Sequence, residues 1–499
     1  MIWHSLPPPL MFTCRIEKKA GFGIHSFTHY WEGPMKKLNL QGKDLRRIGL
    51  KDDRASSLAK QVMQKHYKDH KKEEALEILK KVIHNPDKFR NHPQLGKISE
   101  VLTQKAPKQK PVTIDMGPPR PWTIFGEDSI EKGAREQMDT AMKLPISRKG
   151  ALMPDAHQGY GLPIGGVLAT ENEVIPYGVG MDIGCRMCMS VYDLDVKKID
   201  TDTASLKRVL EESTRFGKAE FSGPREDPVL ERPELNEIKF LKSLKKKAHD
   251  QLGTSGQGNH FVDIGILELN EYIPEQDLQP GTYFAVLSHS GSRGSGAEIA
   301  RHYTHIAMDK CNLPKGARSL AWLDLDSEEG IEYWTAMNWA GAYSAANHHW
   351  IHHRLADVLG SKPLALFENH HNFAWREKLP DGSPAIIHRK GATPATKGVL
   401  GIIPGSMADN GYLVRGKGSK DSLDSAAHGA GRKMSRSQAK KQFSEKQMKQ
   451  YLAERKIHLM GGGLDESPLA YKDISEVMHH QADIVDILAL FKPRIVRMA

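Results

Sequence analysis

The sequence predicts one large α+β domain that follows a small basic helical extension. The chain has 499 residues and is 39% hydrophobic, so it can bury a large core. From about Trp122 to the end, short apolar runs typical of strands alternate with patterns typical of helices. Before that point, apolar residues recur at helical spacing among many charges, and no fixed-period repeat is visible.

The first 121 residues divide into three expected segments. Residues 1–34 lack clear periodicity, and we expect them to form a disordered tail or to reflect a misassigned start, with Met35 as the alternative first residue. Residues 35–103 are expected to form the basic helical extension, which Asn85-Pro86 and His92-Pro93 break into short helices. Residues 104–121 have the proline and lysine content of a linker.

Residues 122–499 are expected to form the large domain. Its strands are predicted by short apolar runs, namely VLAT at 167–170, FAVLSHS at 284–290, AIIHRK at 385–390 and GVLGIIP at 398–404. Its helices are predicted by longer stretches at helical spacing, namely 298–311 and 334–359. One domain is the simplest account of this alternation.

Charge and composition restrict the function classes. The formal net charge of +10 favours an anionic partner, nucleic acid above all, although a solvated basic surface is an equal alternative. The helical extension is then either a packing module, which we favour, or an RNA-contacting arm. Four cysteines in so long a chain indicate no disulfide framework, which suits the reducing cytoplasm. No stretch approaches the roughly 20 apolar residues of a membrane helix, and the start does not resemble a secretory signal.

Several metal-binding residue types stand out. Asp182 and Cys185 lie among closely spaced glycines, which allow a tight backbone around a buried ion. Combined with His260, His289 and His371, they form a donor set that suits Zn²⁺, Fe²⁺ or Mn²⁺ better than Ca²⁺ or Mg²⁺. Cys185 and Cys188 also make a lone C-x-x-C, but no second pair accompanies it, so a structural zinc site is disfavoured.

Segments that join glycine to polar residues recur along the domain. Glycine-rich backbone lets N–H groups approach phosphate oxygens, so these segments predict a site for polyphosphate plus metal. None matches a Walker A or Rossmann sequence. Eight of the blocks, in this order, resemble the RtcB-type RNA ligases, from about Trp122 to Ala499: PDAHQGYGLPIGG, GVGMDIGC, GNHF, HSGSRG, HRKGAT, PGSM, HGAGR and AYKDI.

The resemblance implies a specific reaction. Such a ligase uses GTP and Mn²⁺ to join an RNA 3′-phosphate or 2′,3′-cyclic phosphate to a 5′-hydroxyl, in tRNA splicing or RNA repair. RNA is the implied partner, and an archease-like protein is a further candidate as activator. His428 in HGAGR matches the nucleophile that forms a covalent guanylate. Two Mn²⁺ ions would be held, with the cysteine bridging them, by Asp182, Cys185, His260, His289 and His371.

Further residues take roles from the same resemblance. Arg293 and Lys390 are expected to donate to phosphates, and Asp155 and His157 to support the metal site or orient a 5′-hydroxyl. The guanylate pocket is expected to comprise Asn259, His260, Phe261, Val262, Asp263, His371, Asn372, Pro404, Gly405, Ser406, Met407, His428, Gly429, Ala430, Gly431 and Tyr471.

Departures from the family pattern fall near the nucleotide base. Ala408 follows PGSM, where the family continues with a glycine and a nearby serine. Asp263 stands where the family has a glutamate. The lysine that is usual at the penultimate position is absent, because Met498 precedes Ala499. Guanine specificity is therefore less secure than metal binding. Two interpretations, RNA contacts and a basic surface, are equally supported for Arg432, Lys433 and Arg436.

Two histidine interpretations and two other functions stay open. Of the adjacent His370 and His371, we prefer His371 as the ligand because Asn372 follows it, as an asparagine follows the ligand in the family that the sequence resembles. The cluster His348, His349, His352 and His353 lies on a helical pattern and is expected to be mostly solvated. The first alternative function is a metal-dependent phosphoesterase that hydrolyses RNA ends without needing His428. The second is a non-catalytic RNA-binding protein, which would not depend on metal.

Overall fold

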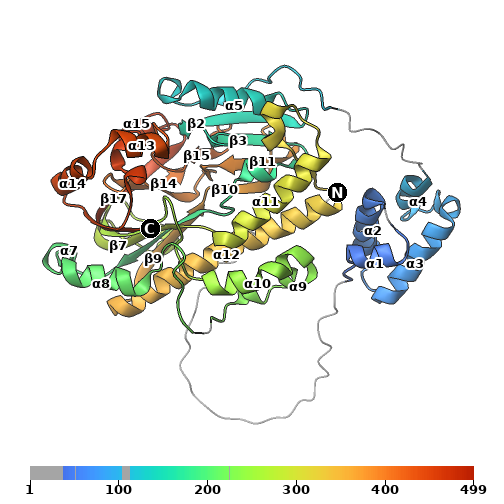
Figure 1. Cartoon of the computed structure of the whole chain (residues 1–499), viewed down its shortest axis with the longest axis horizontal. Helices are drawn as coiled ribbons and strands as arrows, with labels where there is room; N and C mark the ends of the chain where they lie inside the picture. Colours follow the sequence, from blue (N-terminus) through green and yellow to red (C-terminus); the bar gives the residue numbers. More distant parts are fainter. Residues whose placement is uncertain (1–37, 51, 104–112, 224) are drawn as a thin grey trace, which may run out of the picture.

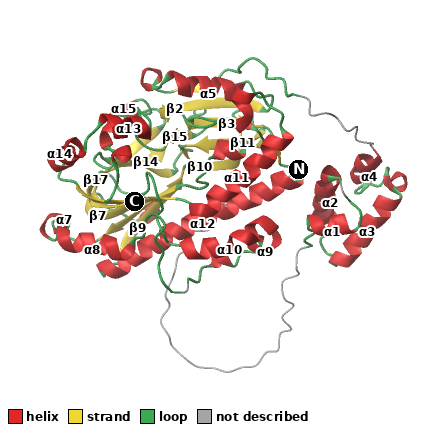
Figure 2. Ribbon diagram, in the orientation of Figure 1, coloured by secondary structure: helices red, strands yellow, loops and turns green. Residues whose placement is uncertain are grey.

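A computed structural model describes residues 38–50, 52–103, 113–223 and 225–499 (Figure 1). The α+β prediction is confirmed: helices surround strands in one large domain, and a separate group of short helices precedes it (Figure 2). The tail predicted at 1–34 lies outside the described residues, as does the first half of the linker predicted at 104–121, residues 104–112.

Four short helices form the N-terminal extension around their own small core, which contains Leu45, Met63, Leu79 and Ile98. They are α1 (Gly42–Arg47), α2 (Asp53–His66), α3 (Lys72–His84) and α4 (Gly96–Thr103). The helix α3 ends one residue before Asn85-Pro86, as predicted, because proline disfavours helical backbone in the residue before it.

The extension packs against the beginning of a long helix of the large domain, α12 (Glu328–Leu359). Lys60 Nζ lies 3.2 Å from Glu328 Oε1, and Gln61 Nε2 donates to Asp326 Oδ1 at 3.3 Å. Ser57 Oγ also donates to the Asp326 carbonyl. These contacts favour the packing role over a free arm.

The strands of the large domain form two main sheets. The smaller has the order β1-β2-β3-β11-β10, and the larger has the order β13-β14-β17-β6-β7-β5-β9, with β16 beside β17. The smaller sheet comprises β1 (Thr123–Ile124), β2 (Ser147–His157), β3 (Ile164–Thr170), β10 (Asn372–Lys378) and β11 (Pro384–Lys390). The larger comprises β5 (Arg186–Tyr192), β6 (Phe261–Leu269), β7 (Gly281–Ser290), β9 (Pro363–His370), β13 (Leu400–Ile403), β14 (Gly411–Gly416), β16 (His458–Met460) and β17 (Val485–Met498). Two short pairs complete the strands, β4 (Glu173–Val174) with β8 (Leu323–Asp324) and β12 (Ala392–Pro394) with β15 (Ser425–Ala427).

Helices cover these sheets, and α12 is the longest of the described helices. Ser327 caps its N-terminus by accepting from the Gly330 N–H, and Gly360, at φ 64°, ends it in the left-handed conformation. The other helices of the domain are α5 (Lys132–Met142), α6 (Pro176–Val179), α7 (Lys198–Thr201), α8 (Thr203–Ser213), α9 (Glu234–Glu237), α10 (Lys239–Gln251), α11 (Arg293–Lys310), α13 (Arg436–Gln442), α14 (Glu445–Glu454) and α15 (Ile474–His479). Within the part of the chain that the structure describes, no helix is long and apolar enough to cross a membrane.

Four adjacent strands of the larger sheet end at one edge and bring distant residues together. The strand β6 begins just after His260, β7 ends just after His289, and β5 begins just after Cys185. Because neighbouring strands are antiparallel, these starts and ends lie side by side, as the pairs Phe261↔His289 and Arg186↔His370 show. The next residue, His371, is where the chain leaves β9 in the larger sheet and enters β10 in the smaller one.

Buried neutral histidines should make the fold sensitive to acid, and His388 on β11 is the clearest case outside the candidate site. Its Nε2 accepts from the Ile175 N–H at 2.9 Å, its Nδ1 donates to the Leu168 carbonyl at 3.2 Å, and burial lowers its pKa to about 4. The folded chain favours the neutral form of His388. The contribution of this residue to the free energy of folding is therefore complete above the pKa of histidine in the unfolded chain, and it is lost as the pH falls toward 4. By linkage, we expect this residue to cost about 2 kcal/mol of stability at pH 5.

The measurement is the thermal midpoint of wild type and His388→Gln at pH 7.5 and pH 5. The variant should unfold at lower temperature at both pH values, but its midpoint should fall less between them. An identical fall in both proteins would contradict the prediction.

Candidate metal centre and nucleotide cleft

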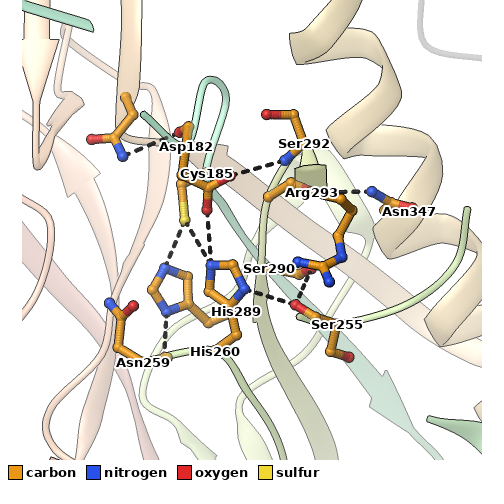
Figure 3. Close-up of polar contacts among 12 residues, drawn as sticks. Asp182, Cys185, Ser255, Asn259, His260, His289, Ser290, Ser292, Arg293 and Asn347 are labelled. Carbon is orange, nitrogen blue, oxygen red and sulfur yellow. Dashed lines mark hydrogen bonds and ion pairs between the residues drawn. The ribbon is translucent and has the colours of Figure 1, made fainter. Parts of the chain in front are cut away.

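Asp182, Cys185, His260 and His289 lie together at this sheet edge (Figure 3), and the fifth predicted metal ligand, His371, lies beside His289. The Cys185 Sγ lies 3.1 Å from His289 Nε2 and 3.6 Å from His260 Nε2. The His289 Nε2 lies 3.3 Å from His371 Nε2, and His260 Nε2 lies 2.9 Å from Asp182 Oδ2. The neighbouring His370 instead stacks on Trp375, with ring centroids 5.0 Å apart.

Backbone carbonyls fix the orientation of two of these imidazoles. His260 Nδ1 lies 2.7 Å from the Ser255 carbonyl, and His289 Nδ1 lies 3.0 Å from the Asn259 carbonyl. A carbonyl only accepts, so each Nδ1 carries a proton and each Nε2 faces the cluster. Such outer hydrogen bonds are typical of metal-ligating histidines.

The cluster therefore gathers acceptors that lack a positive partner. The His260 Nε2 faces the Asp182 carboxylate, and His289 Nε2 faces both Cys185 and His371. Burial lowers the pKa of His289 to about 3 and that of His371 well below its usual range, so protons do not supply the charge near pH 7. Sulfur, nitrogen and one carboxylate oxygen suit a transition-metal ion, so the residues fit such a group.

Two overlapping groups of ligand atoms share Cys185. One consists of Cys185, His289 and His371, and the other of Asp182, Cys185 and His260; within each group the atoms lie within 4.8 Å of one another. Burial raises the pKa of the Cys185 thiol, so a cation is needed to hold it as thiolate. Gly291 follows the end of β7, and its lack of a side chain lets the chain pass close to Asp182. A Cβ at Gly291 would lie 2.1 Å from Asp182 Oδ1.

A cleft of about 410 Å³ opens above the cluster. Asp182, Cys185, His289 and Lys390 line it, together with most of the predicted pocket residues, namely Asn259, Phe261, His371, Asn372, Pro404, Gly405, Ser406, Met407, His428, Gly429, Ala430, Gly431 and Tyr471. Lys390 is buried, which lowers its pKa to about 7. The glycine-rich turns thus meet in one place, as their composition predicted.

Four predicted contacts do not line the cleft, and the first of them, His260, faces Asp182 in the metal-ligand cluster instead. Val262 points to the opposite face of β6 and packs in the core with Ile264. Asp263 shares the face of Phe261 but is buried below it, and burial raises its pKa well above the usual range. Arg293 lies beside the metal-ligand cluster, where its Nε donates to Thr254 Oγ1 at 3.1 Å.

His428 lies at the cleft with its ring held by Asp155. The His428 Nδ1 is 2.6 Å from Asp155 Oδ2, which also accepts the His428 backbone N–H at 3.2 Å. Asp155 is fully buried on β2, and the His428 and His371 ring centroids are 4.9 Å apart. Asp155 was expected at the metal or at a 5′-hydroxyl, but its carboxylate contacts His428 instead. His157 lines the cleft, and its Nδ1 lies 3.1 Å from the Asp155 carbonyl.

The prediction of a mostly solvated histidine cluster on α12 is wrong for His348 and His352. Both are buried, because this face of α12 packs on β5 and β7; only His349 and His353 are exposed. Ser288 Oγ lies 2.7 Å from His348 Nδ1 and 2.8 Å from His352 Nε2, so the rings are held by hydrogen bonds. They lie beside Cys188, and Cys185 and Cys188 therefore belong to separate clusters rather than to one C-x-x-C site.

Several residues that line the cleft were not predicted from the sequence, namely Tyr160, Tyr177, Glu466 and Met498. Glu466 is buried and pairs with Arg432 at 3.1 Å, while the Arg432 guanidinium lies 5.0 Å from the centre of the Tyr471 ring. Tyr160 belongs to the PDAHQGYGLPIGG block and Glu466 lies just before the AYKDI block, but neither side chain was predicted to line the cleft.

Sulfur and nitrogen donors at the floor of a glycine-lined cleft are features of a metal-dependent enzyme. The family model described as tRNA-splicing ligase RtcB matches residues 137–238 and 225–499. The RNA-splicing ligase RtcB of Escherichia coli strain K12 is 32% identical over 409 residues, which cover 76% of this chain and 96% of that protein. The tRNA-splicing ligases RtcB of Nanoarchaeum equitans and Thermococcus kodakarensis are 30% and 28% identical; each match covers 75% of this chain, and 94% and 93% of those proteins. The chain belongs to the RtcB family.

Proposed function

We propose that this protein is an RNA ligase that uses GTP and Mn²⁺ to join a 3′-phosphate or 2′,3′-cyclic phosphate end to a 5′-hydroxyl end, in tRNA splicing or RNA repair. One observation carries the proposal beyond family membership. His428 lies in the same cleft as the metal-ligand cluster, and the buried Asp155 accepts from its Nδ1 at 2.6 Å. That contact leaves Nε2 as the free ring nitrogen.

The metal ligands in this proposal are Asp182, Cys185, His260, His289 and His371, which would hold two Mn²⁺ ions with Cys185 shared between them. The arrangement of acceptors around one thiol supports this assignment. When bound, such ions supply positive charge that offsets the charge on phosphate oxygens during transfer.

His428 acts as the nucleophile. Its neutral Nε2 forms a bond to the α-phosphorus of GTP, and the bond from that phosphorus to the pyrophosphate oxygen breaks. The ring becomes positively charged, and the Asp155 carboxylate at Nδ1 stabilises that charge. Where the RNA ends in a 2′,3′-cyclic phosphate, water first adds to the phosphorus and the bond to the 2′-oxygen breaks, which leaves a 3′-phosphate. An oxygen of the RNA 3′-phosphate then displaces His428 and takes the guanylate. Attack by the 5′-hydroxyl on the RNA phosphorus completes the joint and releases GMP.

Other residues position the phosphates and the base. The turns from Pro404 to Met407 and from Gly429 to Gly431 offer backbone N–H groups, while Lys390 adds a donor. Tyr471 packs against the base, with Met498 nearby in the cleft wall. Because Asp263 is buried away from the cleft, we assign it no contact with guanine. An archease-like activator and a cytoplasmic location complete the proposal; the free thiols of Cys185, Cys188 and Cys311 suit a reducing compartment.

The test uses two RNA oligonucleotides, one ending in a 2′,3′-cyclic phosphate and the other beginning with a 5′-hydroxyl. Wild type should produce a joined strand in the presence of GTP and Mn²⁺, and His428→Ala should not. His353→Ala is the matched control because His353 is exposed on α12. If His428→Ala still processes the ends and wild type only hydrolyses them, the phosphoesterase alternative replaces the ligase.

A further inference from the structure

We propose that Tyr160 and Tyr177 form a stacking platform for an unpaired RNA base beside the joint. The inference rests on the proposed RNA-ligase function and adds a binding site for the polynucleotide. Both tyrosines line the cleft that also contains His428 and the metal-ligand cluster. An aromatic face at such a cleft suits single-stranded nucleic acid, because every base has a π-face that can stack.

Tyr160 is unusually exposed for a large ring. It is 75% exposed, on the loop between β2 and β3, although it lines a cleft rather than a convex surface. Isolated exposed apolar side chains are common and need no function. Two further observations distinguish Tyr160 from that case: the backbone beneath it is held in place, and cations lie beside it.

The loop that carries Tyr160 is fixed from below. Gln137 on α5 makes two hydrogen bonds to Gly159, one to its carbonyl at 2.6 Å and one from its N–H at 3.0 Å. The buried Lys390 donates from Nζ to the Tyr160 carbonyl. At Gly161, φ is +72°, and a Cβ there would lie 3.1 Å from the Ser319 carbonyl oxygen. A fixed backbone under a free ring is preorganised, which lowers the entropic cost of binding.

Tyr177 extends the aromatic surface and brings positive charge. Its ring lies edge-to-face with Tyr160, with centroids 6.3 Å apart at an interplanar angle of 77°. The Lys390 Nζ lies 5.2 Å from the centre of the Tyr177 ring. Burial raises the pKa of the Tyr177 hydroxyl, and the nearby Arg301 acts in the opposite direction. Aromatic rings flanked by cations recognise a base together with its phosphate.

The platform is joined to the reacting centre by one short segment. Gly391 follows Lys390, and a Cβ on Gly391 would lie 3.1 Å from His428 Cε1. Lys390 thus contacts the Tyr160 backbone, and the next residue, Gly391, lies close to His428. We therefore assign the platform to the nucleotide at the joint. Stacking has little sequence preference, so ligation should tolerate any terminal base.

The experiment measures RNA binding and ligation separately. Oligonucleotides carry 2-aminopurine at the 3′-phosphate end or at the 5′-hydroxyl end, and its fluorescence falls when the base stacks. Wild type should quench one of these two probes, and Tyr160→Ala should lose that quenching and raise the KM for RNA by roughly tenfold. Tyr160→Phe should restore both properties, because it keeps the ring. Tyr272→Ala, which removes another exposed tyrosine outside the cleft, is the control.

Unchanged quenching and unchanged KM in Tyr160→Ala would overturn the proposal, as would the absence of quenching at both ends in wild type. Labelling with α-labelled GTP is followed in parallel. Loss of the label in Tyr160→Ala would mean that guanine, not RNA, stacks there, and would also overturn it. If wild type itself takes no label, the ligase proposal fails, but the quenching result still decides whether an RNA base stacks on Tyr160.

Discussion

Cys185→Ala is expected to lose ligation almost entirely, by more than about a hundredfold, together with bound Mn²⁺. Losing an outer-shell partner of a metal typically costs 10- to 100-fold, and losing a shared ligand should cost more. Cys185 is the residue common to both groups of ligand atoms, so one substitution disrupts both. The measurements are the Mn²⁺ content after dialysis and the rate at which the RNA strands are joined.

Cys311→Ala is the matched control for that experiment. Cys311 is also a buried free thiol, but it contacts the Trp322 carbonyl and takes no part in the metal-ligand clusters found among the described residues. It should retain metal and ligation. Full metal content and full ligation in Cys185→Ala would contradict the assignment.

Asp155→Asn is expected to slow transfer of GMP to the protein by about 10² to 10⁴-fold. The carboxylate holds His428 Nδ1 at 2.6 Å and stabilises the charge that develops on the ring; an amide is neutral and can present a donor to Nδ1, which favours the wrong tautomer. In a serine protease, the corresponding aspartate-to-asparagine change lowers kcat by about 10⁴. The measurement is the initial rate of labelling with α-labelled GTP.

Asp381→Asn, on the exposed turn between β10 and β11, provides the comparison for Asp155→Asn. It should label at the wild-type rate. Retained Mn²⁺ content in Asp155→Asn separates a defect at His428 from a defect of the metal site. Wild-type labelling by Asp155→Asn would show that the carboxylate has no role in the transfer.

The predicted metal ligands are distant along the chain but adjacent at one sheet edge. Cys185, His260, His289 and His371 each flank or end a different strand of the order β6-β7-β5-β9. The spacing of these residues along the chain does not predict the order of the strands in the sheet. The resemblance of whole blocks supplied what the spacing of single histidines did not.

The errors have identifiable physical causes. Successive residues on a strand point to opposite faces, so Phe261 and Val262 cannot both line one cleft, yet both were assigned to it. His348 and His352 have a helical spacing that fits a solvated face as well as a buried one; only the packing of α12 on β5 and β7 decides between these. The partner of Asp155 was not predictable either, because Asp155 and His428 are 273 residues apart in the chain.

The most direct test of the central claim is covalent labelling. Purified protein is incubated with Mn²⁺ and α-labelled GTP and then separated on a denaturing gel, beside His428→Ala and the surface control His353→Ala. The account predicts label on wild type and on His353→Ala, and none on His428→Ala. A wild-type protein that binds Mn²⁺ but takes no label, or a His428→Ala variant that labels fully, would contradict it.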